Sequence, residues 1–159
     1  MSQRAEELSR RIEKFNHDAI AFVEAMSDED WKANCEWEEW TAGMTARHIG
    51  AGHFGIFGMC GMILEGKELP QMTMEEINAM SDKDSREHAD TTKAETLEAM
   101  RDNGAKLVAF VSGLSDEDLD RKGSMPAFGG EASVNQIIEF VIFQSAREHI
   151  DNIKKATGK

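Results

Sequence analysis

The chain of 159 residues carries 30 Asp and Glu against 18 Lys and Arg, which gives a formal net charge of −12. Its length suits one domain, residues 1–159, whose core needs neither disulfides nor a structural metal. The acidic balance argues against binding to nucleic acid or to anionic membranes, because both require clustered cationic side chains. Two cysteines fit a reducing compartment, and no stretch has the apolar run of a signal peptide or a membrane span. We therefore expect a soluble, cytoplasmic protein.

The first predicted helix covers residues 3–26, where apolar side chains recur at spacings of three and four. Ser27 then opens a short acidic segment. That segment carries three tryptophans: Trp31, Trp37 and Trp40. A second long helix is predicted from Thr41, as the N-cap, to about Glu65, where a glycine and a proline follow.

Residues 66–90 are predicted as a connection, with a short helix after Thr73 and then a charged surface stretch. A third long helix covers residues 92–114 and begins at a predicted capping box of Thr92 with Glu95. A loop that contains glycines and a proline follows it.

The last predicted helix covers residues 134–156, and Ser133 with Gln136 forms a second capping box at its start. Four long helices joined by one short and two longer connections predict an all-α fold. Its class is a four-helix bundle with short extra helices in the connections. Such bundles build ligand and metal sites between facing helices.

The second long helix contains His48, and an α-helical wheel places Gly52, Gly55 and Met59 within about 40° of it. Glycine inside a helix costs about 1 kcal/mol relative to alanine, so something must approach this backbone closely. Either a neighbouring helix or a small-molecule ligand satisfies that requirement, and the sequence leaves both open. The usual nucleotide-binding and metalloprotease motifs are absent.

The last helix places His149 in the middle of its inward apolar stripe. A polar group there needs a hydrogen bond or a metal, so a satisfied core histidine and a metal ligand are both open interpretations. Two inward histidines on two long helices favour a metal, because they can meet across the core. The Cys60 thiol is interpreted as an ordinary buried group. Cys35 lies in the acidic tryptophan-containing segment, and the sequence supplies no cationic neighbours that would activate its thiol.

Short motifs around the second long helix and on the last helix carry a family resemblance: Trp40-Thr41, His48-Ile49, His53 and residues 146–150. They resemble the DinB-like (damage-inducible) four-helix-bundle metalloenzymes over nearly the whole chain. The resemblance implies three ligands for a divalent metal such as zinc or nickel. His48 matches the ligand on the second long helix, and His149 matches the last ligand.

The chain departs from the family pattern at the middle ligand, four residues before His149, where it has Ser145. A neutral hydroxyl is a poor ligand for a borderline ion. We therefore expect a degraded, two-histidine metal site that water or substrate completes, with weak affinity. Asn152, one turn beyond His149, is expected to orient that histidine.

The resemblance implies a divalent-metal-dependent transferase or isomerase that uses a low-molecular-weight thiol. The alternative is a non-catalytic bundle that has lost its metal and is either small-molecule-binding or stress-associated. A homodimer is expected, because helix 44–64 is apolar almost all round. A purely structural dimer, with this helix partly buried against a partner chain, is a third interpretation.

Overall fold

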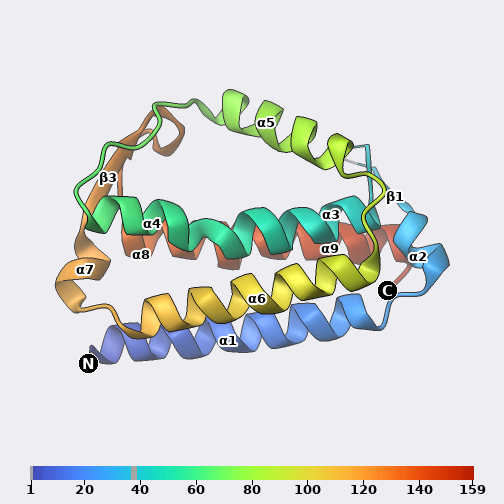
Figure 1. The fold of residues 1–159 in the computed structure, drawn as a ribbon, viewed down its shortest axis with the longest axis horizontal. Helices are drawn as coiled ribbons and strands as arrows, with labels where there is room; N and C mark the ends of the chain where they lie inside the picture. Colours follow the sequence, from blue (N-terminus) through green and yellow to red (C-terminus); the bar gives the residue numbers. More distant parts are fainter. Residues whose placement is uncertain (1, 37–38) are drawn as a thin grey trace.

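The computed structural model describes residues 2–36 and 39–159, so Trp37 lies outside the described residues. Four long helical segments form a bundle, as the sequence predicts, and two of them are single α-helices, α1 (Gln3–Glu24) and α6 (Lys93–Ser112). In Figure 1, α1 and α6 lie side by side along one edge of the molecule. No helix in the described part of the chain is long and apolar enough to cross a membrane.

The second and fourth long segments are composite helices, in which the backbone changes its winding. The second consists of α3 (Ala42–His48), the π-helix η1 (Ile49–His53), the 3-10 helix η2 (Phe54–Ile56) and α4 (Phe57–Leu64). The fourth consists of α8 (Val134–Ile138), the π-helix η4 (Glu139–Ala146) and α9 (Arg147–Thr157). The sequence pattern predicted both segments as uninterrupted α-helices.

The connections are more structured than predicted. They contain the short helices α2 (Asp28–Lys32) and α7 (Asp116–Asp120), the longer α5 (Met74–Glu87), and the 3-10 helix η3 (Pro126–Phe128). They also contain two antiparallel strand pairs, β1 (Asn34–Cys35) with β2 (Trp40–Thr41) and β3 (Lys122–Met125) with β4 (Gly130–Ser133).

Helix α5 gives the bundle its topology. In Figure 1 the second long segment runs from right to left, and α5 then carries the chain back over the top of the bundle. The third long helix, α6, therefore runs in the same direction as the second, while α1 and the α8 to α9 segment run the opposite way. The charged stretch predicted as a surface connection forms the second half of α5, where Asp82 accepts a hydrogen bond from Arg86 one turn later.

Local capping signals locate most helix starts correctly. The side chains of Thr41, Thr73 and Thr92 each accept a hydrogen bond from a backbone N–H three residues later. The predicted capping box of Ser133 and Gln136 is confirmed in both directions. At Thr92 only the threonine half of the predicted box is present.

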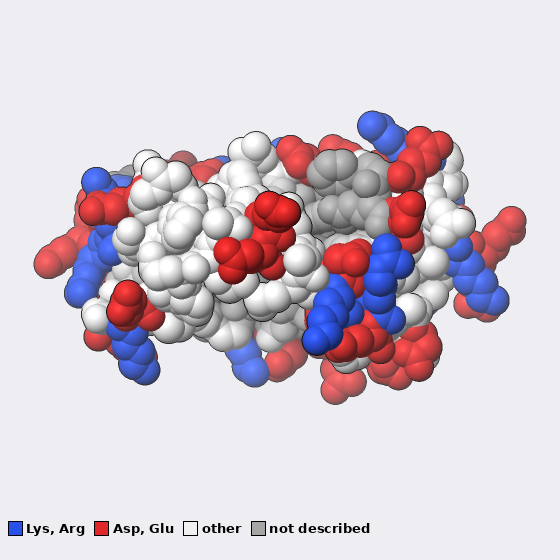
Figure 2. Space-filling model, turned by 90° about the horizontal axis from the view of Figure 1, so that it is seen from above, with Lys and Arg blue, Asp and Glu red and all other residues white. Residues whose placement is uncertain are grey.

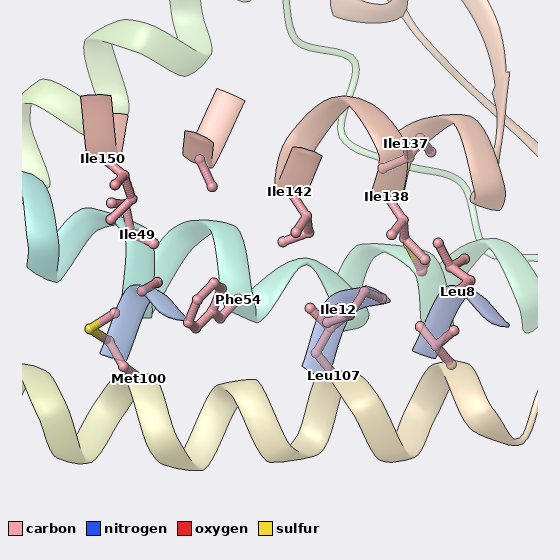
Figure 3. Packing of buried hydrophobic residues seen from close by; sticks show 14 of the residues in the cluster. Leu8, Ile12, Ile49, Phe54, Met100, Leu107, Ile137, Ile138, Ile142 and Ile150 are labelled. Carbon is pink, nitrogen blue, oxygen red and sulfur yellow. The ribbon is translucent and has the colours of Figure 1, made fainter. Parts of the chain in front are cut away.

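The core runs along the centre of the bundle, and all four long segments contribute to it (Figure 3). Its completely buried members include Ile12, Ile49, Phe54, Met100, Leu107, Ile138 and Ile142. Each such side chain contributes about 1.5–3 kcal/mol to folding by leaving water.

One glycine of the second segment serves helix packing. A Cβ atom at Gly50 would lie 2.7 Å from Cγ of Met100, so α6 can approach η1 only because this position lacks a side chain. Asn103 of α6 also donates a hydrogen bond of 2.9 Å to the carbonyl oxygen of Gly50. For Gly50, the structure supports the interpretation that a neighbouring helix approaches closely.

Candidate metal centre

Three imidazole rings meet between the second and fourth long segments: His48, His53 and His149. One nitrogen of each ring lies within 4.8 Å of those of the other two. The ring centroids are 4.7 Å apart for His48 and His53, 5.2 Å for His48 and His149, and 5.0 Å for His53 and His149. The structure thus brings together the two predicted histidines and adds a third.

The winding of η1 explains why His53 was left out of the predicted site. In an α-helix, residues five apart differ by about 140° in direction, which would point His53 away from His48. A π-helix forms hydrogen bonds between residues five apart, as the Phe54 N–H does with the Ile49 carbonyl. Residues at that spacing lie about one turn above each other, so His53 shares a face with His48.

Two signals in the sequence point to this change of winding. The stretch after His48 is rich in glycine, which weakens a regular α-helix, and π-helical turns frequently occur at functional sites. The second signal is the spacing of five between His48 and His53, which is the hydrogen-bonding period of a π-helix.

Burial keeps the three imidazoles neutral. It lowers the pKa of His48 to about 4, with a further contribution from His149, and burial alone lowers the pKa of His149 to about 4. Burial also lowers the pKa of His53 well below its ordinary value, and the two neighbouring imidazoles add to this effect. Neutral imidazoles are the form that binds metals, so no proton has to be displaced at neutral pH.

Ser145 lies beside the cluster, on η4. Its hydroxyl is 2.9 Å from Nε2 of His53, within hydrogen-bonding distance. The residue that the family resemblance places at the middle-ligand position therefore contacts the imidazole that the prediction omitted. The sequence prediction named two histidines, and His53 of the second long segment adds a third imidazole to the group.

Trp40 forms one wall of the centre. Its ring stacks on His149 at a centroid distance of 6.3 Å and an interplanar angle of 18°, and it meets the His48 ring edge-on at 5.1 Å. The indole Nε1 donates a hydrogen bond of 2.9 Å to Asp82 on α5. A second link joins α3 to α5, between Arg47 and Asp84 at 2.8 Å. Together these contacts hold α5 over the histidine cluster.

The histidines border a pocket of about 880 Å³ that lies among the second segment, α5, the β3 to β4 hairpin and the fourth segment. Gly52 and Met59 line this pocket, as predicted for a cavity beside His48, whereas Gly55 is not among its lining residues. Asn152 does not line it either, and its predicted orienting role stays a prediction.

Both cysteines are buried. Burial raises the pKa of the Cys60 thiol to about 12, so it stays protonated and unreactive at neutral pH. Thr45 donates a hydrogen bond of 3.6 Å to the sulfur of Cys35. Neither thiol belongs to the three-histidine group.

The donor set fits a divalent ion of the zinc type. Zinc binds imidazole nitrogens at about 2.0–2.1 Å in tetrahedral geometry, so two nitrogens on one ion lie about 3.3–3.4 Å apart. The three nitrogens lie within 4.8 Å of one another, so the rings would have to move toward the ion by roughly an ångström to bind it. Three protein ligands with an adjoining pocket are also typical of catalytic rather than structural zinc sites.

Comparison with known proteins places this site in a family context. The model of the DinB superfamily matches residues 11–148, which is most of the chain. Among solved structures, the chain is similar to YfiT from Bacillus subtilis, described as a probable metal-dependent hydrolase with an unusual four-helix bundle topology. The TM-score is 0.77 at 17% sequence identity, over 99% of this chain and 89% of that chain, which shows a shared fold. A search of curated protein sequences finds no match. From the family match and the shared bundle, we conclude that the chain belongs to the DinB superfamily.

Proposed function

We propose that this protein is a divalent-metal-dependent enzyme that transfers a low-molecular-weight thiol to a small-molecule acceptor. One observation carries the proposal: three neutral imidazoles converge at the edge of a pocket of about 880 Å³. Pockets of about 300–1,000 Å³ are typical of small-molecule sites.

In this proposal His48, His53 and His149 hold the ion. A bound divalent ion, with zinc and nickel as the candidates, lowers the pKa of a thiol that reaches it and so supplies a nucleophile at neutral pH. Trp40 packs against two of the three rings and limits their rotation. In the transfer, the thiol gives up its proton to solvent, its sulfur bonds to a carbon of the acceptor, and a leaving group departs with the electron pair of the broken bond.

The carboxylate that contacts the wall of the centre, Asp82, is committed to other partners, which disfavours it as a general base for a water nucleophile. Among the described residues that line the pocket, only Asp82 and Glu131 carry carboxylates. Asp82 accepts hydrogen bonds from Arg86 and from Trp40, one at each carboxylate oxygen, and these bonds lower its pKa. A water nucleophile gains from a nearby general base, whereas a thiolate needs none.

Hydrolysis is the second candidate, because the structural neighbour from Bacillus subtilis is described as a probable metal-dependent hydrolase. The same three histidines would hold the ion, and water would take the place of the thiol. The two reactions therefore differ in the nucleophile and not in the ligands.

The experiment compares metal-free protein with protein reloaded with zinc or nickel. Conjugation of a small thiol to 1-chloro-2,4-dinitrobenzene and hydrolysis of 4-nitrophenyl acetate are followed by absorbance. We expect metal-dependent conjugation that His149→Ala abolishes and that His17→Ala, which changes an exposed histidine, retains. Metal-dependent hydrolysis without conjugation would favour the second candidate, and rates that do not respond to metal in either assay would contradict both.

A further inference from the structure

We propose that the acceptor bound in this pocket is an elongated amphiphile, a molecule with a reactive polar head and an unbranched apolar tail. The head lies at the histidine end of the pocket. The tail lies at an apolar end, which is lined by residues of α4, the start of α5 and the β3 to β4 hairpin. The proposal deepens the proposed function by naming a substrate class for the same site. It rests on that function for the chemistry at the head, while the argument for the tail uses the pocket walls alone.

Along the bundle axis, the walls of the pocket change from polar to apolar. In the second segment, His48 and His53 come first and Met59 follows at the far end. The fourth segment runs the opposite way, so Phe140 lies toward the same end as Met59 (Figure 1). Phe140 and His149 are nine positions apart, which corresponds to roughly 13 Å at a helical rise of about 1.5 Å per residue. The pocket is therefore elongated, and its two ends differ in polarity.

Helix α5 covers the pocket and repeats this order. Its pocket-lining residues recur at spacings of three and four, which places them on one face of the helix. They are Met74, Ile77, Asn78, Ser81 and Asp82. The apolar pair stands at the start of α5, whereas Asp82 stands at the histidine end, where it accepts the hydrogen bond from Trp40. Three helical segments thus grade from polar to apolar in the same direction.

The apolar end leaves large hydrophobic side chains in contact with water. Met74 is 41% exposed and Phe140 is 47% exposed, and both line this end of the pocket. Of the polar residues there, Glu131 is exposed, and the amide oxygen of Gln136 already accepts a hydrogen bond of 2.9 Å from the Ser133 N–H. A tail that covers the apolar side chains gains affinity by about three- to fourfold for each methylene group that leaves water.

The outer surface shows the same division. Figure 2 views the molecule from above, the side on which α5 lies. Charged side chains gather toward the right, whereas the left and centre are largely uncharged apart from some acidic side chains. In Figure 1, α4 and the β3 to β4 hairpin lie toward the left and α3 lies toward the right. The largely uncharged area is therefore on the side of the apolar end of the pocket.

The test measures how affinity depends on the length of the tail. 1-Hexanol and 1-octanol are titrated by calorimetry into the metal-free full chain, so that no ion contributes to binding. We expect octanol to bind about tenfold more tightly than hexanol, because two more methylene groups leave water. Equal affinity for the two alcohols, or no binding of octanol at millimolar concentration, would overturn the proposal.

Two variants at matched positions of α5 locate the tail. Met74→Gln places a polar group of similar size in the pocket wall. Met80→Gln makes the same change at a side chain that is 59% exposed and does not line the pocket. We expect Met74→Gln to weaken octanol binding by at least about threefold and Met80→Gln to leave it unchanged. Equal effects of the two variants would overturn the assignment of the tail to this end.

Zinc separates this proposal from the proposed function. Octanoate carries a carboxylate, which a divalent ion binds, so zinc-loaded protein should bind octanoate more tightly than metal-free protein does. If zinc leaves octanoate binding unchanged while octanol still binds more tightly than hexanol, the metal-dependent function fails and the tail assignment stands. If zinc tightens octanoate binding while the two alcohols bind equally, the tail assignment fails and the metal centre stands.

Discussion

His48 and His53 stand five residues apart in one helical segment, yet their rings meet edge to face at a centroid distance of 4.7 Å and an interplanar angle of 88°. An α-helix cannot produce that contact, and the π-helical turn of η1 does. Local rewinding of one long helix thus supplies two of the three histidines, and the opposite helix supplies His149.

The buried imidazoles predict how the stability of the metal-free protein depends on pH. The pKa values of His48 and His149 are about 4 in the folded state, against about 6.5 when unfolded. Between these values the unfolded chain binds more protons, so the free energy of unfolding decreases as the pH falls from 6.5 to 4. The expected loss is of the order of 3 kcal/mol for each histidine.

Urea denaturation in the presence of a chelator, at several pH values, measures this loss. In His149→Asn, the free energy of unfolding should fall less steeply between pH 6.5 and pH 4 than in the wild type. This holds whatever the substitution does to the free energy of unfolding at neutral pH. Parallel pH profiles for the two proteins would show that His149 does not contribute in this way.

Trp40 has two separable roles, as a wall of the centre and as a tether to α5. Trp40→Phe keeps an aromatic ring against the histidines but removes the hydrogen bond to Asp82. We expect the free energy of unfolding to fall by about 1–2 kcal/mol, because a hydrogen bond to a charged group is lost. Zinc affinity, measured by competition with a chromophoric chelator, should change by less than about threefold, since the ligands stay in place. If Trp40→Phe lost as much unfolding free energy as Trp40→Ala, the ring contact with the histidines and the hydrogen bond to Asp82 would not be separable roles.

Two glycines of the second long segment should respond to alanine in opposite ways. At Gly50 a Cβ atom would lie 2.7 Å from Met100 and 3.3 Å from its backbone nitrogen, so Gly50→Ala should cost about 1–3 kcal/mol of unfolding free energy. At Gly61 a Cβ atom would meet nothing within 4 Å, so Gly61→Ala should stabilise α4 by up to about 1 kcal/mol. Chemical denaturation measures both effects. Destabilisation by Gly61→Ala would indicate a contact that the single chain does not show, as in the predicted homodimer.

Much of the fold follows from local sequence signals. The N-caps at Thr41, Thr73, Thr92 and Ser133 mark helix starts, and heptad spacing identifies α1 and α6. The structured connections were not predicted, because two-residue strands such as β1 and β2 have too few residues to show an alternating pattern. The length of α5 was missed because its second half has few apolar residues, and ion pairs and links to α3 stabilise it instead.

The site was predictable only in part, and for a geometric reason. His48 and His149 were found because each lies on an inward face of a regular helix. A wheel with 3.6 residues per turn cannot align His53 with His48, because it assumes that α-helical winding continues through Ile49–His53. The pocket includes α5 and the β3 to β4 hairpin, whose positions over the bundle no local pattern specifies.

The central claim is that His53 completes a three-imidazole metal centre. The most direct test is the zinc and nickel content of protein purified without an affinity tag, measured by mass spectrometry after dialysis against each metal. We predict about one ion per chain for the wild type and for His17→Ala, and a more than 100-fold weaker affinity for His53→Ala. Losing a ligand should cost more than the roughly 10–100-fold that follows loss of an outer partner. One ion per chain bound equally tightly by His53→Ala, or no ion bound by the wild type in excess metal, would contradict the account.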